Sequence, residues 1–149
     1  MSMQRTLVLC KPDTVQRGLV GRVVSRFEEK GLKLVGMKML RIDEGLAGRH
    51  YAEHVEKPFY ADLLAFITAS PIVALAVEGD NAVEVVRNLM GVTNPQKAGS
   101  GTIRGDFGLN LTMNLVHGSD SLASAQREVA LFFAPEELYD YETALREWT

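Results

Sequence analysis

The chain has 149 residues, of which 46% are hydrophobic and 23% are charged, and its formal net charge is −3. This length and composition are typical of a globular protein with a sizeable core, so we expect one domain over residues 1–149. The slightly acidic balance argues against a nucleic-acid partner, and an anionic ligand therefore needs a local concentration of Lys and Arg.

The first half of the chain alternates patterns typical of strands and of amphipathic helices. The expected elements are a strand over residues 5–11, a helix over 19–30, a strand over 33–42, and two helices over about 44–54 and 61–68. Pro12 stops the first strand, and Gly31 ends the first helix because glycine readily adopts the left-handed C-cap conformation.

The second half adds two strands and two helices around a long irregular segment. The expected elements are a central strand over 72–77, a helix capped by Asp80 or Asn81 and ended by Gly91, a loop over 92–114, a strand over 114–116, a helix capped by Ser119, Asp120 or Ser121, and a tail over 135–149 anchored by Trp148. An irregular stretch of this length inside a compact domain is usually functional.

The order of these elements, βαββαβ plus an extra helix, predicts an α+β fold. We expect a ferredoxin-like sandwich, in which a four-stranded antiparallel sheet carries helices on one face and the long loop precedes the last strand.

Two further features bear on the compartment. Cys10 is the one cysteine, so it cannot form a disulfide within the chain, and we expect a small core residue there. The N-terminus has no secretory hydrophobic region, and the apolar run over 72–77 is far too short to cross a bilayer. These observations predict a cytoplasmic protein that does not contact the membrane.

His117 has the most informative surroundings in the chain. It follows an apolar strand and precedes Gly118 and three good helix-capping residues, at positions 119–121. A histidine between a strand end and a helix start is partly dry, held in one orientation and open to a ligand, and neutral imidazole forms covalent intermediates. The simpler alternative is a turn histidine that bonds a neighbouring hydroxyl.

Several polar residues at element ends or in the long loop suit a phosphate ligand. They are Lys11, Arg87, Thr93, Arg104 and Asn114. Two arginines, a lysine and a threonine around one imidazole would bind a polyphosphate, because guanidinium groups clamp phosphate oxygens bidentately. Taken singly, each residue is more typical of a solvated surface position.

Taken together, the motifs resemble those of the nucleoside diphosphate kinase family. The matching stretches are Lys11 to Gly18, His50-Tyr51, Lys57-Pro58-Phe59, Thr93-Asn94-Pro95, Gly101 to Phe107, and Asn114 to Ser121. They occur in family order, and the resemblance extends from about residue 5 to residue 148. The Asn-x-x-His-Gly-Ser-Asp-Ser stretch is a highly specific signature.

The resemblance implies an enzyme that transfers the γ-phosphoryl group of ATP, or of another nucleoside triphosphate, to nucleoside diphosphates in two steps, and so maintains nucleoside triphosphate pools. His117 would carry the group as a pros-phosphohistidine. The resemblance also implies roles for the other residues. Glu128 would orient the histidine, Ser119 would supply a nearby hydroxyl, and Phe59 would stack on the base. Phosphates would be held by Arg87, Thr93 and Arg104, whereas the ribose and the transferring phosphate would be contacted by Lys11 and Asn114, with Tyr51 close by.

The resemblance also implies Mg²⁺ and a homo-oligomer, for which we favour a hexamer over a tetramer. Mg²⁺ commonly binds through substrate phosphates and water, so no residue of the chain is predicted as a metal ligand. The chain departs from the usual family pattern at Thr14, where glycine or alanine is frequent, and at Thr112-Met113, which replace a common Gly-Arg.

Two alternative functions stay open. One is a catalytically silent binding module on the same scaffold. The other is a zinc hydrolase, because His50 and His54 fit the H-x-x-E-H pattern and share one face of a helix if the segment is helical. Two other motifs are incomplete. Asp106-Phe107-Gly108 matches a protein-kinase motif without the rest of a kinase, and Gly99-Ser100-Gly101 lacks the remainder of a Walker sequence.

Overall fold

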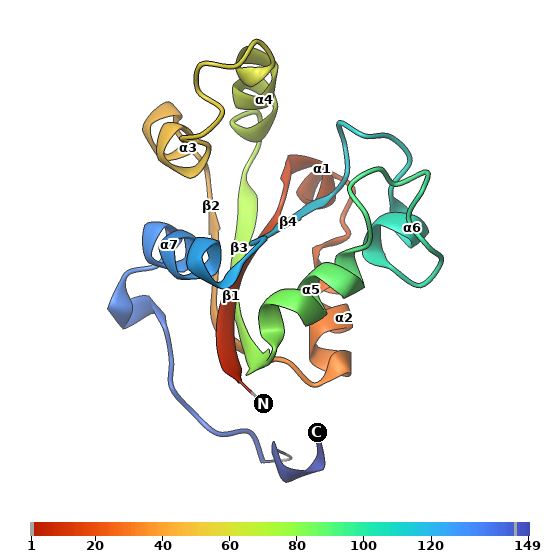
Figure 1. Ribbon diagram of the computed structural model, residues 1–149, viewed down its shortest axis with the longest axis vertical. Helices are drawn as coiled ribbons and strands as arrows, with labels where there is room; N and C mark the ends of the chain where they lie inside the picture. The colour runs from red at the N-terminus through yellow and green to blue at the C-terminus, as the bar shows by residue number, and fades with distance from the viewer. Residues whose placement is uncertain (1, 145) are drawn as a thin grey trace.

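The computed structural model describes residues 2–144 and 146–149 and contains one antiparallel sheet (Figure 1). Its strands are β1 (Met3–Cys10), β2 (Lys33–Leu40), β3 (Ile72–Asp80) and β4 (Val116–Gly118). The strand order is β2-β3-β1-β4, and every neighbouring pair is antiparallel. The predicted ferredoxin-like α+β fold is therefore confirmed, and β3 lies inside the sheet as expected.

Helices cover both faces of this sheet, so the expectation of one covered face is wrong. The helices are α1 (Pro12–Gln16), α2 (Val20–Lys30), α3 (Glu44–His50), α4 (Tyr60–Ile67), α5 (Ala82–Met90), α6 (Ile103–Phe107) and α7 (Leu122–Phe132). In Figure 1, α7 lies on one side of the strands, and α2 and α5 lie on the other.

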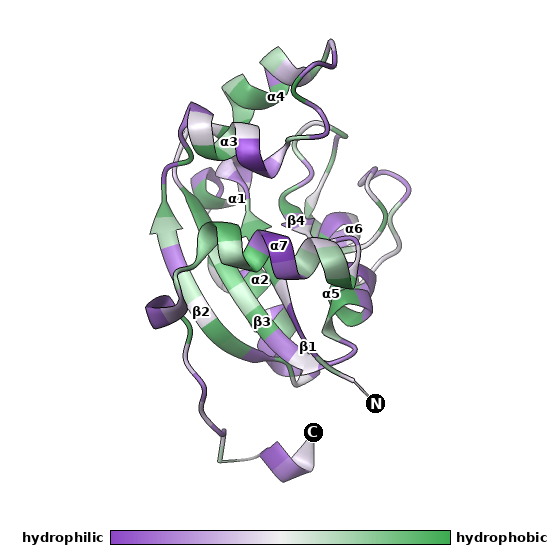
Figure 2. Cartoon of the chain, turned by 60° about the vertical axis from the view of Figure 1, so that its left-hand side comes forward, coloured by the Kyte–Doolittle hydropathy of each residue, from purple (hydrophilic) through white to green (hydrophobic). Residues whose placement is uncertain are grey.

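The composition of the central strands explains the second layer. Val8 and Cys10 of β1 pack into one apolar cluster with α2 and α5, whereas Leu7 and Leu9 pack into the opposite cluster with α7. A stretch that is apolar at every position, such as residues 7–10 of β1 and 72–77 of β3, needs cover on both faces, and Figure 2 shows most of β3 in the hydrophobic colour.

The helix boundaries mostly follow the predicted caps. Gly31 and Gly91 end α2 and α5 with φ of 104° and 85°, and the Ser121 hydroxyl accepts a hydrogen bond from the N–H of Ser124 at the start of α7. Asn81 occupies the N-cap position of α5, but its side chain donates to Glu84 and does not cap the helix. The α3 helix ends at His50, four residues earlier than expected.

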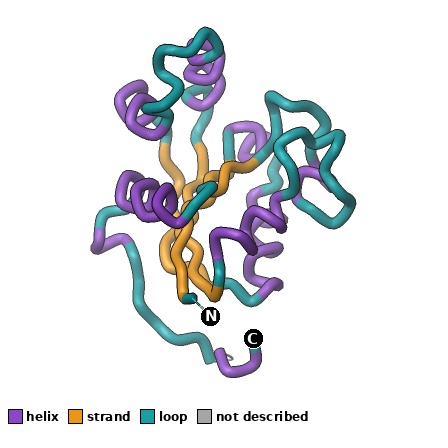
Figure 3. The backbone as a smooth tube through the Cα atoms, viewed as in Figure 1, coloured by secondary structure: helices purple, strands orange, loops and turns teal. Residues whose placement is uncertain are grey.

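The last strand also differs from its prediction, because β4 begins at Val116 and places His117 at its centre. Residues 114–115 lie outside the strand, since Leu115 has a φ of 76° and the N–H of Val116 bonds back to the carbonyl of Asn114 at 2.9 Å. The preceding loop, drawn mainly in teal in Figure 3, contains the short helix α6.

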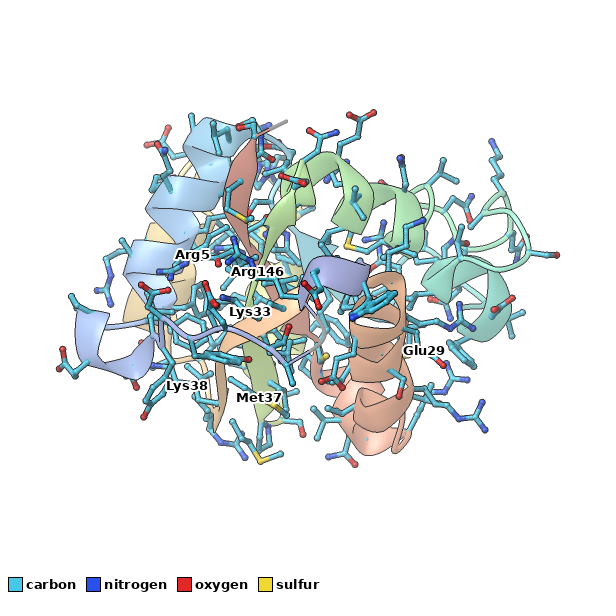
Figure 4. All side chains as sticks on the ribbon, turned by 90° about the horizontal axis from the view of Figure 1, so that it is seen from below. Arg5, Glu29, Lys33, Met37, Lys38 and Arg146 are labelled. Atoms are coloured by element: carbon cyan, nitrogen blue, oxygen red, sulfur yellow. The ribbon has the colours of Figure 1, made fainter. Side chains whose placement is uncertain are left out.

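The C-terminal tail is not anchored by Trp148, whose side chain is 77% exposed. Polar contacts to β2 hold the tail instead: the N–H of Tyr139 donates to the carbonyl of Val35, and the Lys38 ammonium bonds the Glu137 carboxylate. Lys33 likewise donates to the carbonyl of Tyr141. In Figure 4 the tail runs past Lys33 and Lys38 on β2.

Among the helices of the described residues, none is both long and apolar enough to span a membrane.

Candidate active site

His117 lies on β4 and faces the carboxylate of Glu128, which is on α7. The Nε2 atom of His117 is 2.7 Å from Oε1 of Glu128, and the hydroxyl of Ser119 donates to the same oxygen at 2.8 Å. Ser119 and Glu128 are buried, whereas the side chain of His117 is 23% exposed. The sheet and α7 together therefore fix the ring while leaving part of it open.

The tautomer of His117 follows from the chemistry of Glu128. Burial alone would raise the pKa of this carboxyl, but the hydrogen bond and charge of His117 and the hydroxyl of Ser119 lower it below its ordinary value. An ionised carboxylate only accepts hydrogen bonds, so Nε2 carries the proton and a neutral ring keeps its lone pair on Nδ1. Among the described residues, Nδ1 has no hydrogen-bond partner.

His50 packs directly against His117, although the sequence indicated it only as half of a zinc motif. The two ring centroids are 4.7 Å apart in an edge-to-face arrangement. Burial, followed by the effect of His117, lowers the pKa of His50 to about 3, so its ring is neutral near pH 7. Both ring nitrogens of His50 are buried without a hydrogen-bond partner in the described part of the chain.

A series of aromatic rings connects His50 with Phe59. Tyr51 lies 4.5 Å from His50, His54 lies 6.3 Å from Tyr51, and Phe59 lies 5.4 Å from His54, all measured between ring centroids. Tyr51 is partly buried, and burial raises the pKa of its hydroxyl. Phe59 is 46% exposed at the outer end of the series, where an accessible ring suits stacking with a planar ligand, and the Lys57 ammonium lies 5.9 Å from its centroid.

Lys11 and Asn114 form the second part of the site. Lys11 follows β1, and its ammonium donates to Oδ1 of Asn114 at 2.9 Å. Burial, followed by the charge of Arg104, lowers the pKa of Lys11 to about 8, although Asp13 acts in the opposite direction. Because burial disfavours the charged form of Lys11, an anion that binds beside it would stabilise the ammonium. The amide of Asn114 also donates to the carbonyl of Thr93, over 3.4 Å.

A strained turn joins this lysine–asparagine pair to His117. The positive φ of Leu115 and the hydrogen bond from Val116 to Asn114 define a γ-turn, a conformation that costs energy in an L-residue. The Asp13 carboxylate accepts the N–H of Leu115 at 3.0 Å, and the Thr14 hydroxyl donates to the carbonyl of Leu115 at 2.5 Å. The start of α1 therefore holds the turn in place.

Arg104 and Arg87 contact the backbone around His117. Arg104 is buried, and its guanidinium donates to the carbonyls of Gly91, Asn114 and Val116. Burial and the charge of Arg87 lower the pKa of Arg104 to about 10, so it stays charged near pH 7. The exposed Arg87 donates to the carbonyl of Gly118 at 3.2 Å. Arg104 thus shapes the loop, while Arg87 keeps more of its guanidinium free for a ligand.

The potential metal ligands do not follow the H-x-x-E-H motif. Because α3 ends at His50, His50 and His54 do not share a helical face, and His54 packs between Tyr51 and Phe59. Within residues 2–144 and 146–149, the one group of three metal-ligating side chains is His50, His117 and Glu128. This result contradicts the geometric basis of the zinc-hydrolase alternative.

The structure brings together most of the residues singled out in the sequence. His117, Glu128 and Ser119 form one contact group, and Tyr51 reaches it through His50. Lys11, Asn114, Thr93 and Arg104 form a second group, whereas Phe59 lies apart. Sequence reasoning missed the roles of His50, Asp13 and Thr14, and the available signal was their position inside or beside the quoted motifs.

Comparisons with known proteins agree on one family. Residues 4–138 match the family model described as nucleoside diphosphate kinase. A nucleoside diphosphate kinase from Archaeoglobus fulgidus is 57% identical over 146 residues, which are 98% of this chain and 97% of that protein. A similar relative from Gloeobacter violaceus is 54% identical over 98% of both chains.

The solved structures give the same result. A halophilic nucleoside diphosphate kinase from Halobacterium salinarum, determined in complex with CDP, is 52% identical and superimposes with a TM-score of 0.96. The match covers 99% of this chain and 98% of that one.

Proposed function

This chain belongs to the nucleoside diphosphate kinase family, an enzyme family of nucleotide-binding phosphotransferases, and from that premise we propose that His117 is the residue that carries the phosphoryl group. The observation that supports this role is the 2.7 Å contact between Nε2 of His117 and Glu128, because it leaves the lone pair on Nδ1. Nδ1 is the ring nitrogen on which a pros-phosphohistidine forms.

The first step is an attack of Nδ1 on the γ-phosphorus of a nucleoside triphosphate. The bond between this phosphorus and the β,γ-bridging oxygen breaks, and its electron pair leaves with the nucleoside diphosphate. In the second step a terminal oxygen of another nucleoside diphosphate attacks the phosphorus of the phosphohistidine. The bond between this phosphorus and Nδ1 breaks, and its electron pair returns to Nδ1. Glu128 stabilises the positive charge of the phosphorylated ring, and Ser119 holds the carboxylate in place.

The basic residues bind the phosphates in this proposal. Phosphoryl transfer requires mainly positioning and charge stabilisation. Lys11, Arg87 and Arg104 supply positive charge close to the strand of His117, and Thr93 and Asn114 supply polar groups beside Lys11.

Phe59 offers the base a stacking surface at the outer end of the ring series, with Tyr51 nearer to His117. Stacking accepts every base, because each base has a π-face, and this suits the exchange of phosphoryl groups among different nucleotides.

Mg²⁺ is part of this proposal as a cation held by the nucleotide. Glu128 is the carboxylate that faces His117, and it is already bonded by His117, Ser119 and Arg127. Such surroundings fit a metal that binds phosphate oxygens and water rather than a cage of protein carboxylates. When bound with the nucleotide, Mg²⁺ would neutralise part of the phosphate charge, and Lys11, Arg87 and Arg104 would hold the phosphates that carry it.

The proposal includes one catalytic domain over residues 1–149 and a homo-oligomer, with a hexamer favoured. A cytoplasmic location stays a prediction of the sequence. The CDP complex of the Halobacterium salinarum relative supports nucleoside diphosphates as ligands of this chain.

The proposed carrier is tested by incubation with γ-labelled ATP. We expect a phosphoryl adduct that survives alkali and is lost in acid, that disappears on addition of GDP with formation of labelled GTP, and that is absent in His117→Ala. The His54→Ala variant serves as the control for removal of a nearby imidazole. An adduct that resists acid, or that persists in His117→Ala, overturns the assignment. Absence of transfer to GDP favours the silent binding module instead.

A further inference from the structure

A group of three metal-ligating side chains lies at the proposed carrier residue. One ligand atom from each of His50, His117 and Glu128 lies within 4.8 Å of the others, and His117 and Glu128 are already 2.7 Å apart. Ligands of a tetrahedral zinc ion are about 3.4 Å apart, since zinc–ligand bonds are about 2.0–2.1 Å long. To reach this geometry, His50 must move toward the other two side chains, and His117 and Glu128 must move slightly apart.

His50 supplies an independent indication of a ligand. Its side chain is 5% exposed, and both ring nitrogens are buried without a partner in the described part of the chain. A neutral imidazole has one donor and one lone pair, and buried polar groups are nearly always bonded. The lone pair of His50 is therefore available, and the ring is packed edge-to-face against His117.

We propose that His50, His117 and Glu128 form a binding site for a transition-metal cation of the Zn²⁺ type, and that occupation of this site inhibits phosphoryl transfer. Two imidazoles and one carboxylate are a donor set that suits zinc, with a fourth position left for water, whereas Mg²⁺ prefers oxygen ligands. The inhibitory part of this inference rests on the proposed function of His117.

Inhibition follows from coordination through Nε2 of His117, the nitrogen that faces Glu128. Zn²⁺ at Nε2 replaces the proton there, so the neutral ring carries its proton on Nδ1 and loses the lone pair that attacks phosphorus. Arg127, 3.5 Å from Glu128, and the cations around Lys11 disfavour a divalent ion, so the site is reversible rather than a permanent structural centre.

Equilibrium dialysis of the chelator-treated, nucleotide-free protein against Zn²⁺ tests the site, with the visible spectrum of Co²⁺ as a report of coordination geometry. We expect one metal ion per chain, a tetrahedral Co²⁺ spectrum, and an affinity at least about tenfold lower in His50→Phe, which keeps an aromatic ring but removes a ligand. His54→Phe is the matched control and retains the binding of the unmodified chain.

Two further measurements apply if His50→Phe does not fold. Glu128→Gln is expected to weaken Zn²⁺ binding, and the phosphorylated chain is expected to exclude Zn²⁺. Unchanged affinity in the folded His50→Phe variant, equal loss in His54→Phe, or no binding at millimolar Zn²⁺ overturns the site.

The site and the proposed function fail separately. A chain that binds Zn²⁺ as described but forms no phosphohistidine overturns the carrier role alone. A chain that transfers phosphoryl groups but binds no Zn²⁺ overturns the metal site alone.

Discussion

Glu128 is the residue on which the reactivity of His117 depends, because its carboxylate fixes the proton on Nε2. Replacement by Gln keeps the shape and removes the charge that stabilises the phosphorylated ring. A hydrogen bond to a charged group contributes about 1.5–3 kcal/mol, so we expect His117 phosphorylation to be roughly ten- to a hundredfold slower in Glu128→Gln.

Rapid-quench measurement of a single turnover with ATP separates this effect from nucleotide binding. Gln126→Ala, an exposed change on the same helix, is the control. Equal rates in Glu128→Gln and in the unmodified chain would contradict the role of the carboxylate.

Lys11 gives the site a dependence on pH with a definite sign. Its pKa in the fold is about 8, below the ordinary 10.5, so between these values the unfolded chain binds more protons than the native one. The contribution of Lys11 to the free energy of unfolding therefore rises as the pH increases from about 8 to about 10.5. Below pH 8 the charged lysine is present in full and destabilises the nucleotide-free fold.

Lys11→Met isolates this contribution. We expect the free energy of unfolding of the variant, relative to that of the unmodified chain, to fall as the pH is raised from 7.5 to 9.5 in urea titrations without nucleotide. A constant difference over this range would show that the pKa of Lys11 is not lowered. The same variant is expected to lose nucleotide affinity at pH 7, because it lacks the cation beside Asn114.

At the level of elements, β4 and α5 approach each other closely at Gly118. A Cβ atom at Gly118 would lie 2.6 Å from the sulfur of Met90 and 3.2 Å from the side chain of Val86. Gly118→Ala therefore forces the buried side chains of Met90 and Val86 to move in the layer between the strand of His117 and the helix of Arg87.

We expect Gly118→Ala to lower the free energy of unfolding by about 1–3 kcal/mol, as overpacking usually does, and to reduce the transfer rate. Gly99→Ala is the matched control, because nothing lies within 4 Å of its added Cβ. Urea unfolding of both variants checks the difference, and equal stabilities would contradict the close packing.

The γ-turn at Leu115 also depends on contact between two elements, because hydrogen bonds from α1 stabilise a conformation that the turn would not keep alone. Asp13→Ala leaves the buried N–H of Leu115 without its acceptor, and such a loss costs about 1–3 kcal/mol. Asp13→Asn retains an oxygen acceptor and is expected to cost less. Urea unfolding of the two variants measures their stabilities, and an Asp13→Asn variant less stable than Asp13→Ala would contradict the role of this acceptor.

For the whole molecule, the two helical layers leave the site at one edge of the sheet. β4 is a short edge strand, and α1, α3 and α7 bring Lys11, His50 and Glu128 to it from separate parts of the chain. The opposite edge strand, β2, exposes Met37 and Met39, with 54% and 63% of their side chains accessible. Exposed apolar side chains on an edge strand favour association with another chain.

We therefore expect a homo-oligomer, and the family resemblance favours six chains of 16.4 kDa. Sedimentation equilibrium measures this mass directly, and a mass of four chains would contradict the hexamer. Met39→Lys places a charge on the β2 edge and is expected to weaken assembly, whereas Val55→Lys, an exposed change on a different segment, is the control.

The sequence by itself determined the order of the strands and of the five longer helices, the ends of α2 and α5 at Gly31 and Gly91, and a helix N-cap within positions 119–121. These features are local or are carried by short motifs, so hydrophobic periodicity and residue chemistry suffice to predict them. The apolar runs at 7–10 and 72–77 do not alternate between apolar and polar residues, and this lack of alternation is the local signal of a sheet covered on both faces.

Only the tertiary structure decided which side chains meet. The packing of His50 on His117, the support of Leu115 by Asp13 and Thr14, and the use of Arg104 on backbone carbonyls join residues 10 to 102 positions apart. The strained turn at Leu115 and the end of α3 at His50 likewise follow from distant packing. A local pattern contains no information about such contacts, because they exist only when the sheet and its two helical layers bring separate segments together.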